Sequence, residues 1–120
     1  YATEYDKKRA FFDAVDLHDR NMVALLLKKG IDIHCIDNDR MSPNYGMSAL
    51  ACASRDDDIE AVKLLLDFGV DVNRVVECYD KKTALLLAVE YCNTEIVELL
   101  LEKGADISYV DSNGCNALSL

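Results

Sequence analysis

The sequence predicts an all-α solenoid of stacked helix–turn–helix units joined by short β-hairpin-like connections. The first observation is a stretch that occurs three times, at residues 19–34, 58–73 and 93–108. Its Gly-x-Asp-[Ile/Val] ends begin at positions 30, 69 and 104, so the copies follow at intervals of 39 and 35 residues (69 − 30 and 104 − 69). The second observation is a shorter apolar segment upstream of each copy. Such a period is typical of arrays in which each unit buries its apolar surface against the next.

Each copy of the repeated stretch predicts one amphipathic helix of three turns. It opens with a residue suited to the helix N-cap, Asp19, Asp58 or Asn93, and a glycine follows eleven positions later each time (30 − 19, 69 − 58, 104 − 93). Short polar side chains at the N-cap accept bonds from the free N–H groups of the first turn, and glycine adopts the left-handed conformation that ends a helix. Apolar residues three and four apart place a stripe on one side of each helix.

The shorter apolar segments predict a first helix in each unit, at residues 10–15, 49–53 and 84–89, and a fourth starts at 117–120. Alanines 14, 53 and 88 recur at one position, where we expect two helices to approach closely. We expect Asp6 to cap the first of these helices. The predicted units cover residues 6–36, 43–75 and 78–110, with a partial unit at 111–120, in a single domain of residues 1–120.

The chain resembles the ankyrin-repeat family over nearly its whole length. The family pattern Thr-Pro-Leu-His-x-Ala stands in weakened form at residues 48–53 and 83–88 and starts again at Asn116. The family's unit end, Leu-Leu-x-x-Gly-Ala-Asp-Val-Asn, is clear at residues 100–108. The interval from Thr83 to Asn116 is 33 residues, the family's usual period. The family's Pro and His are absent, and its glycine between the two helices is replaced by His18, Asp57 and Cys92.

The charge and cysteine content of the chain argue against several classes of partner and location. Thirteen basic and 22 acidic residues give a net charge of −9, which argues against nucleic acid or an anionic membrane as the main partner. The first residues contain no apolar signal region, and the longest aliphatic run is too short to span a bilayer. Five cysteines without a Cys-x-x-Cys pair suggest a reducing compartment. We expect a cytoplasmic module, with the nucleus and delivery into a host cell left open.

No constellation of residues predicts catalysis. His18 and His34 are isolated from each other, and the His and acidic residues at 34–39 lack a second ligand pair with zinc spacing. The acidic run 56–58 is explained by a turn and a helix cap. No Gly-rich phosphate loop and no Ser/His/Asp arrangement is present. The sequence therefore predicts no catalytic residue, cofactor or metal, and a chain that is not an enzyme.

The connection at residues 35–47 is the least regular part of the chain. It carries six residues beyond the family period (39 − 33), with Tyr45-Gly46 as the expected tight turn and Pro43 just before it. One interpretation is a tolerated surface loop, because loop extensions cost little free energy. The other is an extended recognition finger whose contacts are Met41, Tyr45 and Met47.

The resemblance implies a module that binds another protein through its hairpin tips and the concave, exposed side of its first helices. Carried over position by position, the expected contact residues are Asn44, Tyr45, Met47, Arg55, Asp56, Tyr79, Asp80, Lys82, Glu90, Tyr91, Ser112 and Asn113. Three tyrosines among them fit an interface hot spot. We expect a monomeric, non-catalytic module whose partner presents a basic surface. Two alternatives stay open: a regulatory or substrate-docking segment of a larger enzyme or effector, and a purely structural spacer.

Overall fold

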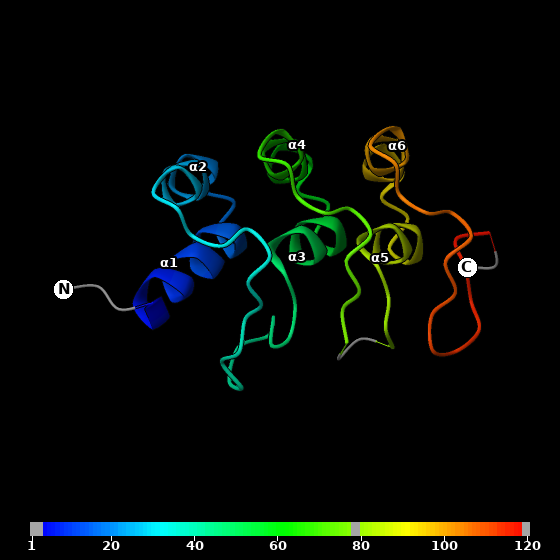
Figure 1. The fold of residues 1–120 in the computed structure, drawn as a ribbon, viewed down its shortest axis with the longest axis horizontal. Helices are drawn as coiled ribbons and strands as arrows, with labels where there is room; N and C mark the ends of the chain where they lie inside the picture. The colour runs from blue at the N-terminus through cyan, green and yellow to red at the C-terminus, as the bar shows by residue number, and fades with distance from the viewer. Residues whose placement is uncertain (1–3, 78–79, 119–120) are drawn as a thin grey trace.

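In the part of the chain that the structure describes, six helices stack in two layers along an elongated body of 47 × 27 × 20 Å (Figure 1). The computed structural model describes residues 4–77 and 80–118, with side chains from residue 7 onwards. The described residues form no strand, and two isolated antiparallel bridges, Ile36–Ser48 and Val76–Lys82, mark the hairpin-like connections. The prediction of an all-α stack is confirmed. One layer holds the first helices, α1 (Glu4–Asp16), α3 (Ala49–Arg55) and α5 (Ala84–Glu90), and the other holds α2 (Arg20–Lys28), α4 (Ile59–Asp67) and α6 (Thr94–Glu102).

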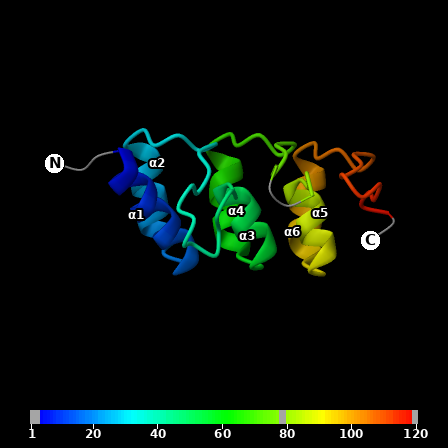
Figure 2. The ribbon, with the colours of Figure 1, turned by 90° about the horizontal axis from the view of Figure 1, so that it is seen from below.

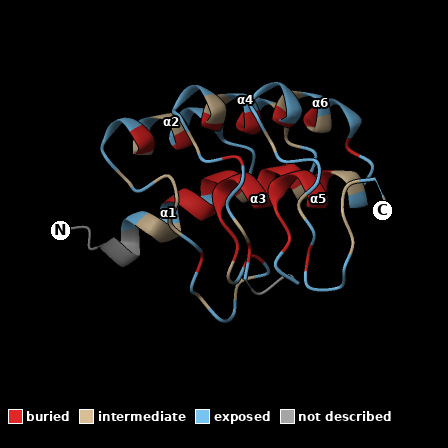
Figure 3. Cartoon of the chain, turned by 45° about the vertical axis from the view of Figure 1, so that its right-hand side comes forward, coloured by how far each residue is buried: buried red, intermediate tan, exposed pale blue. Residues whose placement is uncertain are grey.

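The layer of first helices forms the centre of the core, as the burial colouring in Figure 3 shows. Helix α3 is buried from Ala49 to Ser54 because it packs between α1 and α5 and against α4. The recurring alanines 14, 53 and 88 are at most 4% exposed, in agreement with the predicted close approach of helices. Small side chains here let neighbouring helices pack without a void.

The predicted caps and turns of the second helices are largely confirmed. The side chains of Asp19 and Asp58 each accept a bond of 3.2 Å from the first turn, from Met22 N and Ala61 N. Glycines 30, 69 and 104 have φ of +96°, +83° and +94°. The residues in place of the family's inter-helix glycine also adopt positive φ, at +58° for His18, +58° for Asp57 and +59° for Cys92.

Asn93 departs from the capping prediction. It occupies the N-cap position of α6, but its side chain makes no cap bond. Its Nδ2 instead donates to the carbonyl oxygens of Ser54 at 2.6 Å and Arg55 at 3.3 Å. These carbonyls lie at the end of α3, where helices leave acceptors without intrahelical partners. Asn93 therefore ties the third unit to the second.

The start of α1 also differs from the prediction. The helix begins at Glu4, so Asp6 lies within it and is not its cap. With 13 residues, α1 is nearly twice as long as α3 or α5, which have 7 each. The additional turns bring Lys8 and Arg9 alongside the connection that follows α2, as described below.

Equivalent polar contacts join successive units beyond the second helices. His34 Nε2 accepts from Asp71 N at 2.9 Å, and Asn73 Oδ1 accepts from Asp106 N at 2.8 Å. His34 and Asn73 hold the same place in the repeat (73 − 34 = 39). The histidine thus replaces the family's asparagine as the acceptor between units.

We expect two serines of the second unit to respond oppositely to substitution. Ser54 Oγ is buried without a hydrogen-bond partner among the described residues, where the other units have Val15 and Val89. Ser54→Ala should raise the free energy of unfolding by up to about 1 kcal/mol, because an unpaired buried hydroxyl is removed. Ser48→Ala should lower it by about 1 kcal/mol, because Ser48 caps α3. Urea unfolding measures both, and a loss of stability in both variants would contradict the assignment for Ser54.

The role of Asn93 can be separated from capping with a conservative exchange. Asn93→Asp keeps a good N-cap residue but loses the amide donor and places a carboxylate against two carbonyl oxygens. We expect a loss of about 2 kcal/mol in the free energy of unfolding. Asp58→Asn at the equivalent position keeps the cap of α4 and should cost less than about 1 kcal/mol. Equal losses in the two variants would mean that Asn93 acts as a simple cap.

Candidate partner-binding surface

The hairpin-like connections all project on the side of the first helices, away from the second-helix layer (Figure 1). Seen from this side, the connections and the helices α1, α3 and α5 form one continuous face (Figure 2). Because the units repeat, the last residues of α3 and α5 come to equivalent places on it, Arg55 and Glu90. This face is the candidate partner-binding surface.

Seven of the expected contact residues are exposed. Two are aromatic, with Tyr45 42% and Tyr91 50% exposed. The polar ones are Asp56, Asp80, Glu90, Ser112 and Asn113. Tyr79 lies outside the described residues. These seven side chains are defined here as the contact surface.

Three expected contact residues are buried, and their side chains do not reach the surface. Asn44 and Met47 are 0% exposed, and Lys82 is 7% exposed. Arg55 is half-buried because its guanidinium points inwards, donating to Asn44 Oδ1 at 2.6 Å and Met47 Sδ at 3.2 Å. The sequence identified these positions by analogy, and the structure assigns them to internal support of the hairpins.

The connection after α2 is a hairpin with an enlarged loop. Asp37 N donates to Met47 O at 2.9 Å, and Gly46 N donates to Asp37 O, so the hairpin closes at its base. Gly46, with φ of +80°, thus lies at the base and not at the tip expected for Tyr45-Gly46. We call residues 38–46 the finger. In Figure 2 it lies across the first-helix layer between α1 and α3.

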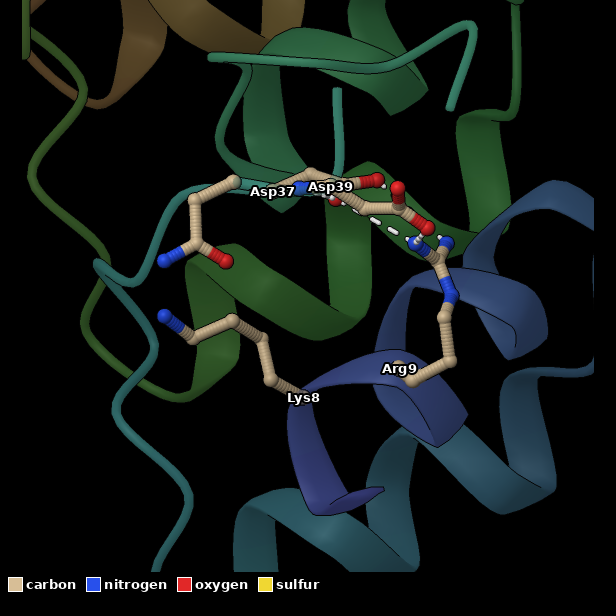
Figure 4. A pocket seen from close by; sticks show the side chains of 5 residues that line it. Lys8, Arg9, Asp37 and Asp39 are labelled. Carbon is tan, nitrogen blue, oxygen red and sulfur yellow. Dashed lines mark hydrogen bonds and ion pairs between the residues drawn. The ribbon is translucent and has the colours of Figure 1, made fainter. Parts of the chain in front are cut away.

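A buried carboxylate ties the finger to α1. Asp37 is 2% exposed, and Arg9 Nη1 and Nη2 donate to its two oxygens at 3.2 and 3.3 Å (Figure 4). The same oxygens accept from Asp39 N at 3.0 Å and Ser42 Oγ at 2.7 Å. Arg9 also reaches Asp39 at 3.3 Å. Paired guanidinium–carboxylate bonds fix orientation as well as distance.

Asn44 forms a second tie at the other end of the finger. Its Nδ2 donates to Asp16 Oδ1 at the end of α1, and its Oδ1 accepts from Arg55 at the end of α3. Asn44 therefore bridges two units with both halves of its amide. Arg55 is oriented in turn by Asp56, with Nε to Oδ1 at 2.8 Å.

The second and third connections are also held in place. Lys82 Nζ lies 2.8 Å from Glu90 Oε2, so a lysine at the hairpin base pairs with the end of α5. Ser112 N donates to Asp80 O at 2.8 Å, and Tyr109 Oη donates to Lys81 O at 2.7 Å. Adjacent connections are thus bonded to each other.

The charge of Lys82 is stabilised by its surroundings. Burial lowers the pKa of Lys82, but the hydrogen bond to Glu90 and the charges of Glu90, Asp111 and Asp80 outweigh it. The pKa of Lys82 is therefore raised above its ordinary value of 10.5. Its equivalent in the preceding unit is Met47 (82 − 47 = 35), so the same place holds either an apolar or a paired cationic side chain.

No metal site emerges from the described residues. They contain no group of three His, Cys, Asp or Glu side chains placed to hold a metal ion. Burial raises the pKa of the thiols of Cys35 and Cys52, which keeps them protonated. Nδ1 of His18 lies 2.7 Å from Asp58 Oδ2. None of the helices in the described ranges is both long and apolar enough to cross a membrane.

Sequence reasoning assigned no role to Arg9 or Asp16, and it considered Asp37 only among the residues at 34–39 that lack zinc spacing. A signal was present for Arg9, which lies seven residues before the end of α1. Ser48 and Thr83 stand at the same distance from the ends of α3 and α5, where they cap those helices. A cationic side chain at a capping position indicates a different role for that position.

The chain belongs to the ankyrin-repeat family. The family model for ankyrin repeats (3 copies) matches residues 11–111. The chain is 36% identical over 85 residues to a putative ankyrin repeat protein, L271, of Acanthamoeba polyphaga mimivirus, covering 69% of this chain and 11% of that protein. It is 30% identical over 105 residues to the putative ankyrin repeat protein FPV034 of fowlpox virus, covering 88% of this chain and 23% of that protein.

A third relative is the human palmitoyltransferase ZDHHC17, 41% identical over 68 residues, with 57% of this chain and 11% of that protein covered. The chain thus spans less than a quarter of the length of these three relatives. Ankyrin repeats are in general protein–protein interaction modules.

The pairing of Lys82 predicts a pH-dependent effect of its removal. Lys82→Met should fit sterically, as Met47 does, but it leaves Glu90 and Asp111 without their cation. We expect a loss of about 1 kcal/mol in the free energy of unfolding at pH 7, since Glu90 is partly exposed. Because the pKa of Lys82 is raised in the folded state, the charged lysine stabilises the fold at pH values below 10.5. This contribution is lost as the pH rises through the pKa that Lys82 has in the folded protein.

Urea unfolding of the original protein and Lys82→Met at pH 7, 9 and 11 therefore tests the pairing. The difference in free energy of unfolding between the two proteins should stay the same at pH 7 and 9 and become smaller at pH 11. A difference that stays constant up to the highest pH would show that lost packing, and not charge, explains the change.

Proposed function

We propose that this module binds a protein partner through the contact surface, namely Tyr45, Asp56, Asp80, Glu90, Tyr91, Ser112 and Asn113. The main support is the exposure of Tyr45 and Tyr91, which belong to two different units. Aromatic side chains with a polar end are enriched among the residues that contribute most to protein binding. An interface with two such anchors and a polar rim fits a folded or extended protein segment.

The partner that fits best presents a basic surface. The chain carries a net charge of −9, and Asp56, Asp80 and Glu90 are exposed on the contact surface. Asp56 and Glu90 are paired with Arg55 and Lys82, whose side chains are mostly buried, so the acidic groups are the ones that face outwards. Such an arrangement accelerates association with cations at low salt and favours basic partners over acidic ones.

Rigid display explains how the surface would work. Because Asn44, Met47 and Lys82 hold the hairpins from within, little conformational freedom remains to be lost on binding. Ordering of loops and side chains is a main cost of association, so a surface fixed in advance binds more tightly with the same contacts.

We also propose a second candidate function. In it, this array docks a substrate or regulator for a catalytic domain in the same polypeptide. It rests on the relation to the palmitoyltransferase ZDHHC17, of which the matched region is 11%. The contact surface would be the same, and the captured protein would be modified by the rest of the polypeptide.

We would test the contact surface by using the original module and two double variants to capture proteins from cell lysate. Tyr45→Ala/Tyr91→Ala removes the aromatic anchors, whereas Leu25→Ala/Leu101→Ala removes equally exposed apolar groups from the second-helix layer, at 47% and 37% exposure. We expect a protein retained by the original module and by the leucine variant to fall at least about tenfold with the tyrosine variant. Retention should also fall as the salt concentration rises.

Helix content and thermal unfolding of both variants serve as controls for folding. If the tyrosine variant retains the same proteins as the leucine variant, the proposed surface is wrong. If the retained protein is a substrate of a catalytic domain encoded in the same polypeptide, the docking function takes precedence over an independent module.

A further inference from the structure

The second-helix layer forms the face of the stack opposite the hairpin-like connections (Figure 1). In each of its helices, the residues nine, six and two positions before the terminal glycine share one side (30 − 21, 30 − 24 and 30 − 28 in α2). This side lies opposite the buried residues of the same helices, such as Val62 and Leu65 in α4. We call these residues the outer positions. All of them are exposed except the half-buried Ala24, and they are Asn21, Ala24, Lys28, Glu60, Lys63, Asp67, Glu95, Glu98 and Glu102.

The charge on this layer reverses from one end of the stack to the other. Helix α2 contains the cations Arg20 and Lys28 and no acid, and Lys29 follows it. Helix α4 alternates in sign at its outer positions, with an acid, a lysine and an acid. Helix α6 contains no cation, and its outer positions all carry carboxylates: Glu95, Glu98 and Glu102. The face is therefore basic at its first helix and acidic at its last.

The charges at the two ends are not explained by the stability of their own helices. Glu98 and Glu102 lie four residues apart in α6, where like charges repel each other. Glu102 also lies in the last turn, where the helix dipole favours a cation. Among the described residues, Arg20 is paired with Glu60 at 3.2 Å, but no ion pair involves Lys28 or Glu102. The last turns of α2 and α6 thus carry opposite charges that find no counter-charge within the described ranges.

We propose that the second-helix layer docks against a second copy of this chain, with α2 of each copy lying on α6 of the other. A two-fold axis parallel to the helices and passing beside α4 produces this arrangement, and every contact then occurs twice. Lys28 comes to lie opposite Glu102 of the other copy, because both residues lie two positions before their glycines and so at one height. Arg20 and Glu95 meet likewise in the first turns. A two-fold axis along the stack would instead place α2 on α2 and α6 on α6, where like charges repel.

The middle of the layer suits the same arrangement. Helix α4 faces its own copy across the axis, and Lys63 has Glu60 three residues before it and Asp67 four residues after it. Each lysine therefore reaches an acid of the other copy and avoids the opposing lysine. Between α2 and α4, a groove lined by Ala24 and Lys63 opens on this face. Because Ala24 leaves space at the height of Glu98, that carboxylate of the other copy enters the groove beside Lys63.

Net charge and size set the strength of this association. Two chains of net charge −9 repel each other at long range, but physiological salt screens charges over about 8 Å, whereas charges in contact still attract. The second helices cover only part of a side of 47 × 20 Å, so the contact is smaller than the roughly 800 Å² per partner of standard complexes. We therefore expect a dimer that forms in concentrated solution and a monomer, as the sequence predicts, in dilute solution. The contact surface on the hairpin side stays free in both.

Charge reversals followed by sedimentation velocity test the dimer at physiological ionic strength. Lys28→Glu and Glu102→Lys each place like charges in both equivalent contacts and should weaken association about tenfold or more. An equimolar mixture of the two variants should associate again, because one contact then holds the exchanged pair and the other holds the original pair. Glu77→Lys makes the same change of charge at an exposed residue of a hairpin-like connection and should leave association unchanged. Helix content checks folding, since Lys28 also interacts favourably with the dipole of α2.

Several outcomes would overturn the inference. It fails if the chain sediments as a monomer at every concentration, or if the mixed variants associate no better than each variant alone. Equal weakening by Glu77→Lys would reduce the effect to overall charge. A dimer lost in Tyr45→Ala/Tyr91→Ala and kept in Lys28→Glu would move the interface to the contact surface. A persistent monomer that binds polylysine, and loses it in Glu102→Lys, would replace the second copy by a basic partner.

Discussion

The packing of α3 between α1 and α5 is the constraint on which the rest of the structure depends. From Ala49 to Ser54 this helix has no exposed side, so it exists as a folded element only within the stack. Alanines at the closest approach keep the units near enough for side chains to bridge them, as Asn93 does to the end of α3. Stability of the array therefore resides in contacts between units as much as in any single unit.

This spacing also determines what the hairpin side can present. Because each first helix ends at an equivalent place, Asp16, Arg55 and Glu90 come to lie in a row, and each contacts a hairpin residue. The three contacts differ in chemistry: carboxylate to amide, guanidinium to thioether and amide, and carboxylate to ammonium. Their shared effect is to hold the hairpins, so the outer hairpin residues Tyr45 and Asp80 have a fixed base.

Periodicity made the helices, the glycine ends and the positive-φ turns at 18, 57 and 92 predictable, because these features depend on residues close in sequence. It did not reveal that Asn93 serves α3 more than α6, nor that Asn44, Met47 and Lys82 point inwards. Those outcomes depend on which polar groups from other units lie within reach. Carrying contact positions over from a family ignores such exchanges, since a buried support and an exposed contact occupy neighbouring places in the motif.

Arg9 illustrates how a departure from the repeat creates something the repeat lacks. A serine or threonine at this position caps its own helix, but in α1 the helix continues past it to Glu4 and has no cap to satisfy there. The position is thereby free for a long cationic side chain, and Asp37, buried in the next hairpin, requires one. A buried carboxylate without a counter-charge costs several kcal/mol. Three departures from the repeat therefore depend on one another: the lengthened α1, Arg9 and the insertion that follows Asp37. The longer helix leaves position 9 free of a capping role, and Arg9 at that position supplies the counter-charge that buried Asp37 needs.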